Sequence, residues 1–160
     1  MNENDRDRLF RANKGRLKIK EYIGFLNSLL KINLDVSSFL NLSETDRINQ
    51  IYFEQFSTVE KKIKNKIEID DTSLLNLEIN NVSNFYKDKF GYLLGHNSEY
   101  CGTVLLPFEL LIKNYRELIL YDGDALNIIS ENMSSGIMID YFDDLDKNQF
   151  RKEFYELVVW

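Results

Sequence analysis

The spacing of apolar residues changes partway along the chain. In the first half, apolar residues recur mostly three or four positions apart, which indicates helices with one buried face. The clearest stripe follows Ser43 and consists of Ile48, Tyr52, Phe56, Val59 and Ile63. A similar stripe lies within residues 17–30, and a third within residues 73–87. We therefore predict three helices, with a connector at residues 35–42 between the first two.

The residues just before two of these stripes favour helix starts. Ser43 offers a hydroxyl N-cap, and Glu44 and Asp46 place negative charge in the first turn, where the helix dipole favours it. Asp70, Asp71 and Thr72 supply the same chemistry before the third helix. The basic residues at the end of the second helix suit a solvated C-terminal turn.

The second half contains short aromatic and branched runs typical of strands. We predict strands at residues 90–95, 101–106, 125–130, 136–142 and 154–160. His96 to Glu99 forms a turn between the first two. Pro107, the only proline, is suited to the first turn of a helix over residues 108–120.

These elements predict an α+β fold. A helical N-terminal half packs on a roughly five-stranded antiparallel or mixed sheet that has one inserted helix. We expect one domain over residues 1–160, with residues 1–16 as a candidate flexible basic arm. Residues 17–89 are mainly helical, and residues 90–160 run strand, strand, helix, strand, strand, strand.

The composition fits a soluble cytoplasmic protein. Of 160 residues, 44% are hydrophobic, which is ample for a core. One Cys and one His exclude a disulfide framework within the chain and a zinc site of the usual ligand types. The polar start of the chain has no signal-peptide core, and no apolar run is long enough to span a bilayer.

Charge is distributed unevenly between the two halves of the chain. Residues 1–70 hold 13 Lys and Arg against 11 Asp and Glu, whereas residues 71–160 hold 7 against 15. Seven of the basic residues crowd the first twenty positions. They suit a nucleic acid, an acidic partner, the acidic half of the same fold, or a solvated terminus.

The acidic charge is concentrated between Glu117 and Asp146, where eight carboxylates occur without a Lys or Arg. Such a field is tolerated when solvent screens it, or it steers a basic partner. Hairpin ends and a strand exit can gather these residues into one rim, with aromatic side chains as anchors. The candidate partner-binding residues are Asp122, Asp124, Glu131, Asp140, Tyr141, Asp143 and Asp144.

Candidate catalytic chemistry is sparse. His96 and Cys101 can form a nucleophile pair only with an orienting group and an electropositive setting, and the nearest ionisable neighbour is Glu99. Asp144 to Asn148 begins like a calcium loop, but Gln149 stands where Gly is needed. No dinucleotide or P-loop fingerprint occurs. We therefore predict no enzyme, no cofactor and no metal site.

Two segments of the second half resemble a known class of proteins. They are Tyr-Cys-Gly-Thr-Val-Leu-Leu-Pro-Phe-Glu-Leu-Leu from Tyr100 and Ser-Ser-Gly-Ile-Met-Ile-Asp-Tyr from Ser134. In general character, residues 90–160 are similar to bacterial immunity proteins that neutralise polymorphic or contact-dependent toxins. The resemblance implies stoichiometric inhibition in the cytoplasm, with an acidic surface that plugs the basic active site of a nuclease toxin.

The leading hypothesis is therefore a non-catalytic inhibitor that occludes a basic toxin through an acidic surface. The alternative is a nucleic-acid-binding or regulatory adaptor that uses the basic segment from Arg6 to Lys20. The sequence favours a protein partner over nucleic acid, because the predicted sheet half is acidic. It predicts no membrane contact.

Overall fold

The computed structural model describes residues 3–62, 66–69, 72–123, 125–145 and 151–160. Helices dominate the first half and strands the second, so the predicted α+β fold is confirmed. The helical elements are α1 (Glu3–Leu30), η1 (Val36–Ser38), α2 (Leu42–Lys62), α3 (Thr72–Phe85), α4 (Ser98–Cys101), α5 (Phe108–Lys113) and α6 (Tyr115–Asp122). The strands are β1 (Lys66–Ile69), β2 (Phe90–Leu94), β3 (Val104–Pro107), β4 (Ala125–Ser130), β5 (Gly136–Leu145) and β6 (Arg151–Val159).

The strands form one six-stranded sheet in the order β1-β6-β5-β4-β2-β3. Every neighbouring pair is antiparallel. The sixth strand is β1, which pairs with β6 from Lys66 opposite Val158 to Ile69 opposite Tyr155. Strand β1 was not predicted, because a run of four residues carries too little pattern to distinguish a strand.

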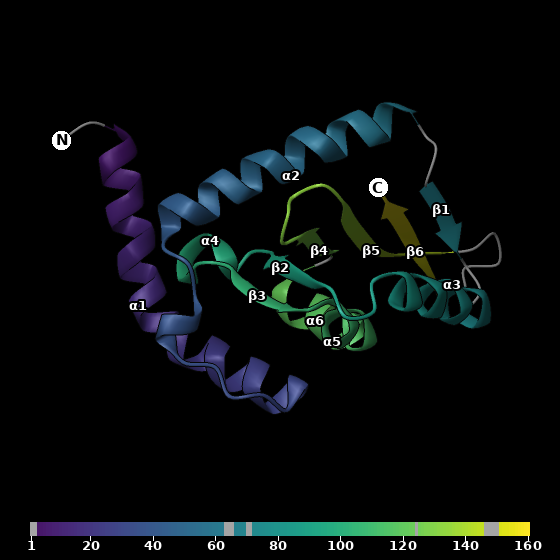
Figure 1. Ribbon diagram of the computed structural model, residues 1–160, viewed down its shortest axis with the longest axis horizontal. Helices are drawn as coiled ribbons and strands as arrows, with labels where there is room; N and C mark the ends of the chain where they lie inside the picture. Colours follow the sequence, from purple (N-terminus) through teal and green to yellow (C-terminus); the bar gives the residue numbers. More distant parts are fainter. Residues whose placement is uncertain (1–2, 63–65, 70–71, 124, 146–150) are drawn as a thin grey trace.

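Helices cover both faces of this sheet (Figure 1). On one face, Leu126, Ile128 and Ile137 pack in the larger core with residues of α1, α3, α5 and α6. On the other face, α2 crosses the sheet and buries Ile48 and Tyr52. Strands with both faces covered explain the continuous apolar runs of the second half.

Three local predictions were wrong in detail. Residues 98–101 form the short helix α4, so Cys101 lies at a helix end and not in a strand. The expected helix over 108–120 is two helices that meet at Asn114, whose side-chain amide donates to the Leu110 carbonyl at 2.8 Å. Helix α2 begins at Leu42, and Asn41 rather than Ser43 accepts the capping hydrogen bond, from the Glu44 amide at 3.0 Å.

The first helix is longer than expected. The described residues of the candidate flexible arm, 3–16, are helical and continue into the rest of α1. No helix among the described residues is both long and apolar enough to cross a membrane.

Candidate protein-binding surface

The predicted acidic residues do not lie on one rim. Glu131 is exposed at the turn between β4 and β5, while Asp140 lies opposite Ala125 at the other end of the same hairpin. Five residues of strand span roughly 16 Å. Glu131 is therefore too far from Asp140 to share one small contact area with it. Asp124 lies outside the described residues.

Asp122 is a structural residue and not an exposed contact. It ends α6, and its carboxylate accepts hydrogen bonds from the Asn97 backbone amide at 2.7 Å and from the Asn97 side-chain amide at 2.5 Å. Burial raises the pKa of Asp122, and the hydrogen bonds from Asn97 oppose that shift. The sequence could not distinguish this role, because a carboxylate at a helix end suits a solvated turn equally well.

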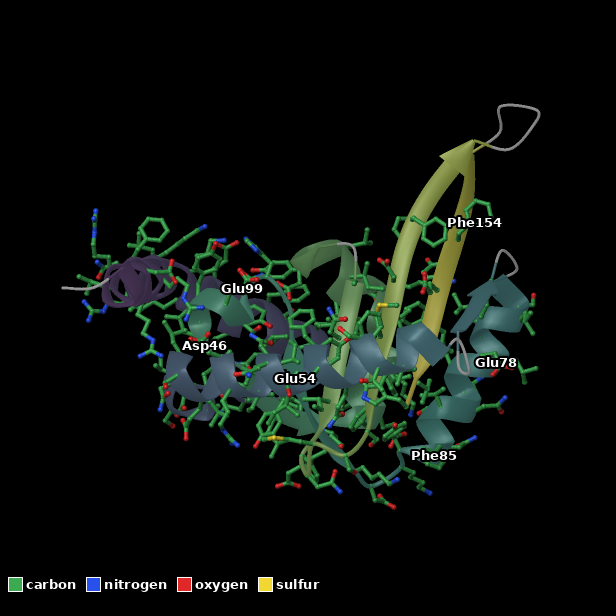
Figure 2. All side chains as sticks on the ribbon, turned by 90° about the horizontal axis from the view of Figure 1, so that it is seen from above. Asp46, Glu54, Glu78, Phe85, Glu99 and Phe154 are labelled. Atoms are coloured by element: carbon green, nitrogen blue, oxygen red, sulfur yellow. The ribbon has the colours of Figure 1, made fainter. Side chains whose placement is uncertain are left out.

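Four of the seven predicted residues lie on the β5–β6 hairpin: Asp140, Tyr141, Asp143 and Asp144. The pairing of β5 with β4 ends at Asp140, and the pairing of β6 with β1 ends at Tyr155. Beyond these positions, residues 141–145 pair only with residues 151–155 among the described strands. We call this two-stranded part, residues 141–145 and 151–154, the hairpin arm. Figure 2 shows it projecting from the rest of the molecule.

The arm carries an aromatic pair on the face that continues the α2 side of the sheet. Phe142 lies opposite Phe154 in the register, and their rings stack with centroids 5.4 Å apart. The Phe142 side chain is 40% exposed. Backbone register places Asp143 opposite Glu153 and Asp144 opposite Lys152. Phe154 is half-buried, so the pair exposes mainly Phe142. A partly exposed aromatic pair among charged residues has the composition of a protein-binding surface.

The opposite face at the base of the arm borders a small cavity of about 190 Å³. Tyr141 and Tyr155 line it from the sheet, with ring centroids 5.3 Å apart. Arg116 and Leu120 line it from α6, and Leu120 is 81% exposed. This cavity was not predicted from the sequence. The available signal was the run Leu118 to Leu120, because one helix face cannot bury three consecutive apolar residues.

The basic residues of α1 are partly used inside the fold. Arg11 donates hydrogen bonds from both terminal nitrogens to the Asp46 carboxylate at 2.8–2.9 Å, which joins α1 to α2. The Lys14 ammonium lies 3.9 Å from the Tyr100 ring centroid, and Lys18 lies near the same ring. These contacts lie within the chain, but Asp46 belongs to the first half of the chain and not to its acidic second half.

The candidate nucleophile pair has unfavourable surroundings. Burial raises the pKa of the Cys101 thiol to about 11, so the thiol is protonated at neutral pH. The His96 ring is instead 3.8 Å from the Glu99 carboxylate and packs edge-on against Tyr100. Over the part of the chain that the structure describes, no group of three or more His, Cys, Asp or Glu residues could hold a metal ion.

Comparison of the chain with protein-family models, with curated proteins and with solved structures finds no match.

Proposed function

We propose that this protein is a non-catalytic inhibitor that binds and occludes a basic protein, and that the hairpin arm is its main contact surface. The observation that carries the proposal is the position of Asp143 and Asp144 on the hairpin arm, with Asp140 next to its base on the same strand. A projecting arm can enter a concave site on another protein. The resemblance to immunity proteins supports a toxin, specifically a nuclease, as the partner.

The charge and the aromatic residues have separate roles in this proposal. Strand β5 contributes three carboxylates and no basic residue, and the facing residues 151–153 of β6 are Arg, Lys and Glu, so the hairpin remains acidic on balance. Such a field speeds the encounter with a basic surface. The Phe142 and Phe154 pair supplies apolar contact area, which is where binding energy usually concentrates. An inhibitor needs both, because fast association without a buried anchor gives a short-lived complex.

The experiment starts with affinity capture of partners from the organism that encodes the chain, at low and at moderate salt. We expect one basic protein that is released by salt and whose activity is lost in a one-to-one complex with the purified chain. Retention of nucleic acid alone would contradict the proposal and favour the adaptor alternative. Retention of a protein whose activity is unchanged in the complex would contradict inhibition.

Charge-reversal variants then test the arm. Burial raises the pKa of Tyr52, and the charge of half-buried Asp140 raises it further, so reversal of Asp140 would also disturb the α2 face. We therefore use Asp143→Lys with Asp144→Lys. With the partner identified, association should slow by about 10-fold or more at low salt.

The matched control is Glu54→Lys with Glu78→Lys, which makes the same charge change on α2 and α3 (Figure 2). If both pairs of substitutions slowed association equally, the net charge of the protein, and not the position of the charges on the hairpin arm, would control the rate.

A further inference from the structure

A groove of about 510 Å³ lies between the first half of α1, the segment that joins η1 to α2, and α4. Figure 1 shows the first turns of α1 and α4, two of the elements that line it, at the end of the molecule opposite β1 and α3. Its volume is within the usual range of small-ligand sites, roughly 300–1,000 Å³. The residues that line it from the connecting segment and α4 are mostly apolar: Val36, Phe39, Leu40, Asn41, Leu42, Tyr100 and Cys101.

Two close backbone approaches hold the walls of the groove together. A Cβ on Gly15 would lie 2.0 Å from the Tyr100 carbonyl oxygen, so only glycine lets α1 approach α4 this closely. A Cβ on Gly102 would lie 2.0 Å from the Leu40 carbonyl oxygen, and Gly102 has a φ of +87°. The Arg11–Asp46 ion pair fixes α1 against α2 beside these contacts. The groove is therefore built into the packing and does not depend on a ligand to form.

The charge of the groove is opposite to that of the whole chain. Arg8 and Arg16 line it from α1 together with Ala12, Gly15 and Ile19, and no carboxylate is among its described lining residues. Neither guanidinium has a carboxylate partner among the described residues. The chain as a whole has a net charge of −6. Two arginines without a carboxylate partner in the described part of the chain, beside an apolar floor, are complementary to an anionic head group on an apolar body.

We propose that this groove binds a single-chain anionic amphiphile, such as a medium-chain carboxylate, with its head group on Arg8 or Arg16 and its hydrocarbon chain along Phe39, Leu40 and Leu42. A hydrocarbon suits this lining better than an extended peptide. A peptide brings a hydrogen-bonding amide at every residue, and the side-chain amide of Asn41, the one side-chain amide in the described lining, is already bonded to Glu44. The two arginines are eight residues apart on α1, about 12 Å, so one head group engages one of them.

The chain contains its own reporter for this site. Cys101, the single cysteine, lines the groove, so a bound ligand should slow its alkylation. The probe is decanoate below its micellar concentration, the reagent is neutral iodoacetamide, and the measurement is the alkylation rate by mass spectrometry. We expect saturable protection by decanoate and about 10-fold weaker protection by decanol, which has the same chain without the charge. Equal protection by the two, or none by decanoate, would overturn the proposal.

Point variants separate the head-group contact from the fold. Arg8→Gln with Arg16→Gln should abolish the advantage of decanoate over decanol, and one of the two single variants should reproduce that loss. The control is Arg6→Gln with Lys20→Gln, which removes two charges of α1 that do not line the groove. Unchanged protection in the Arg8 and Arg16 double variant would overturn the proposal. None of these variants touches the hairpin arm, so the outcome is independent of the inhibitor function.

Discussion

The Asp122 carboxylate accepts two hydrogen bonds from Asn97, one from its backbone amide and one from its side chain, although the two residues are 25 positions apart. This contact ties the end of α6 to the loop after β2. Asn97 is only 8% exposed, so loss of the acceptor leaves buried donors unpaired.

Removal of that acceptor should destabilise the protein. We expect Asp122→Ala to lower the free energy of unfolding by about 1–3 kcal/mol, since buried unpaired donors cost that much. Asp122→Asn keeps an oxygen acceptor and should lose less. Urea unfolding at pH 7 measures both variants. Equal losses in the two would show that the charge of Asp122, and not its acceptor capacity, holds Asn97.

The same residue predicts a pH dependence. Burial raises the pKa of Asp122 above its ordinary value of 3.8, so the folded state holds this proton more tightly than the unfolded state. The contribution of Asp122 to stability is therefore largest at low pH and falls as pH rises from about 4 through the raised pKa. We therefore expect the free energy of unfolding of Asp122→Asn to increase relative to that of the natural protein as pH rises over that range. If the free energies of unfolding of the two proteins changed in parallel with pH, the expectation would be contradicted.

Two glycines of α1 should respond in opposite directions to alanine. Gly15→Ala brings a methyl group against the Tyr100 carbonyl oxygen and should cost about 1–3 kcal/mol. Gly24 has open space around its Cβ position, so Gly24→Ala should stabilise by about 0.5–1 kcal/mol through helix propensity. Thermal unfolding followed by circular dichroism measures both. Tolerance of Gly15→Ala would show that α1 and α4 do not pack as closely as described.

The ion pair between Arg11 and Asp46 predicts energetic coupling between α1 and α2. Their side chains are 18% and 34% exposed, so the pair is partly shielded from solvent. A double-mutant cycle with Arg11→Ala and Asp46→Ala should give a coupling energy of about 0.5–3 kcal/mol. If the stability losses of the two single variants simply added in the double variant, the ion pair would behave like an exposed one that contributes little to stability.

The hydroxyl of Tyr52 donates to the Asn127 side-chain oxygen at 2.6 Å and attaches α2 to the sheet. Tyr52→Phe should therefore lower the free energy of unfolding by about 1 kcal/mol or more. Tyr92→Phe on β2 is the control, since Tyr92 packs in the same cluster and no hydrogen bond of its hydroxyl occurs among the described contacts. If both variants lost a similar free energy of unfolding, the effect would come from the surroundings of the ring and not from the hydrogen bond of the Tyr52 hydroxyl.

Elements whose apolar residues recur with a clear helical or strand period were predictable from the sequence. The stripe Ile48, Tyr52 and Phe56 indicated α2, and the runs at residues 90–95, 125–130 and 136–142 indicated the strands β2, β4 and β5. The break at Asn114 was not predictable from period, because the apolar pattern continues on both sides of it. Strand β1 exists through its pairing with β6, a contact that local pattern does not encode.

The candidate site was predictable in part. The concentration of acid on β5 was visible in the sequence, and the structure places Asp140, Asp143 and Asp144 on one strand. The sequence did not reveal that β4 and β1 stop short and leave the arm to project, because strand pairing lengths depend on neighbours distant in the chain. It also did not reveal the groove between α1 and α4, which requires Gly15 and Tyr100 to meet.

The position of β6 between β1 and β5 has a consequence for the order of folding. Strand β1 has no other neighbour in the described sheet, so it cannot join until β6 is in place. Contacts between segments this far apart in sequence form slowly, because a long loop must close first. The helices and the β2–β3 and β4–β5 hairpins can assemble from local contacts. We therefore expect the pairing of β1 with β6 to be a late step in folding and an early one to open in the native state.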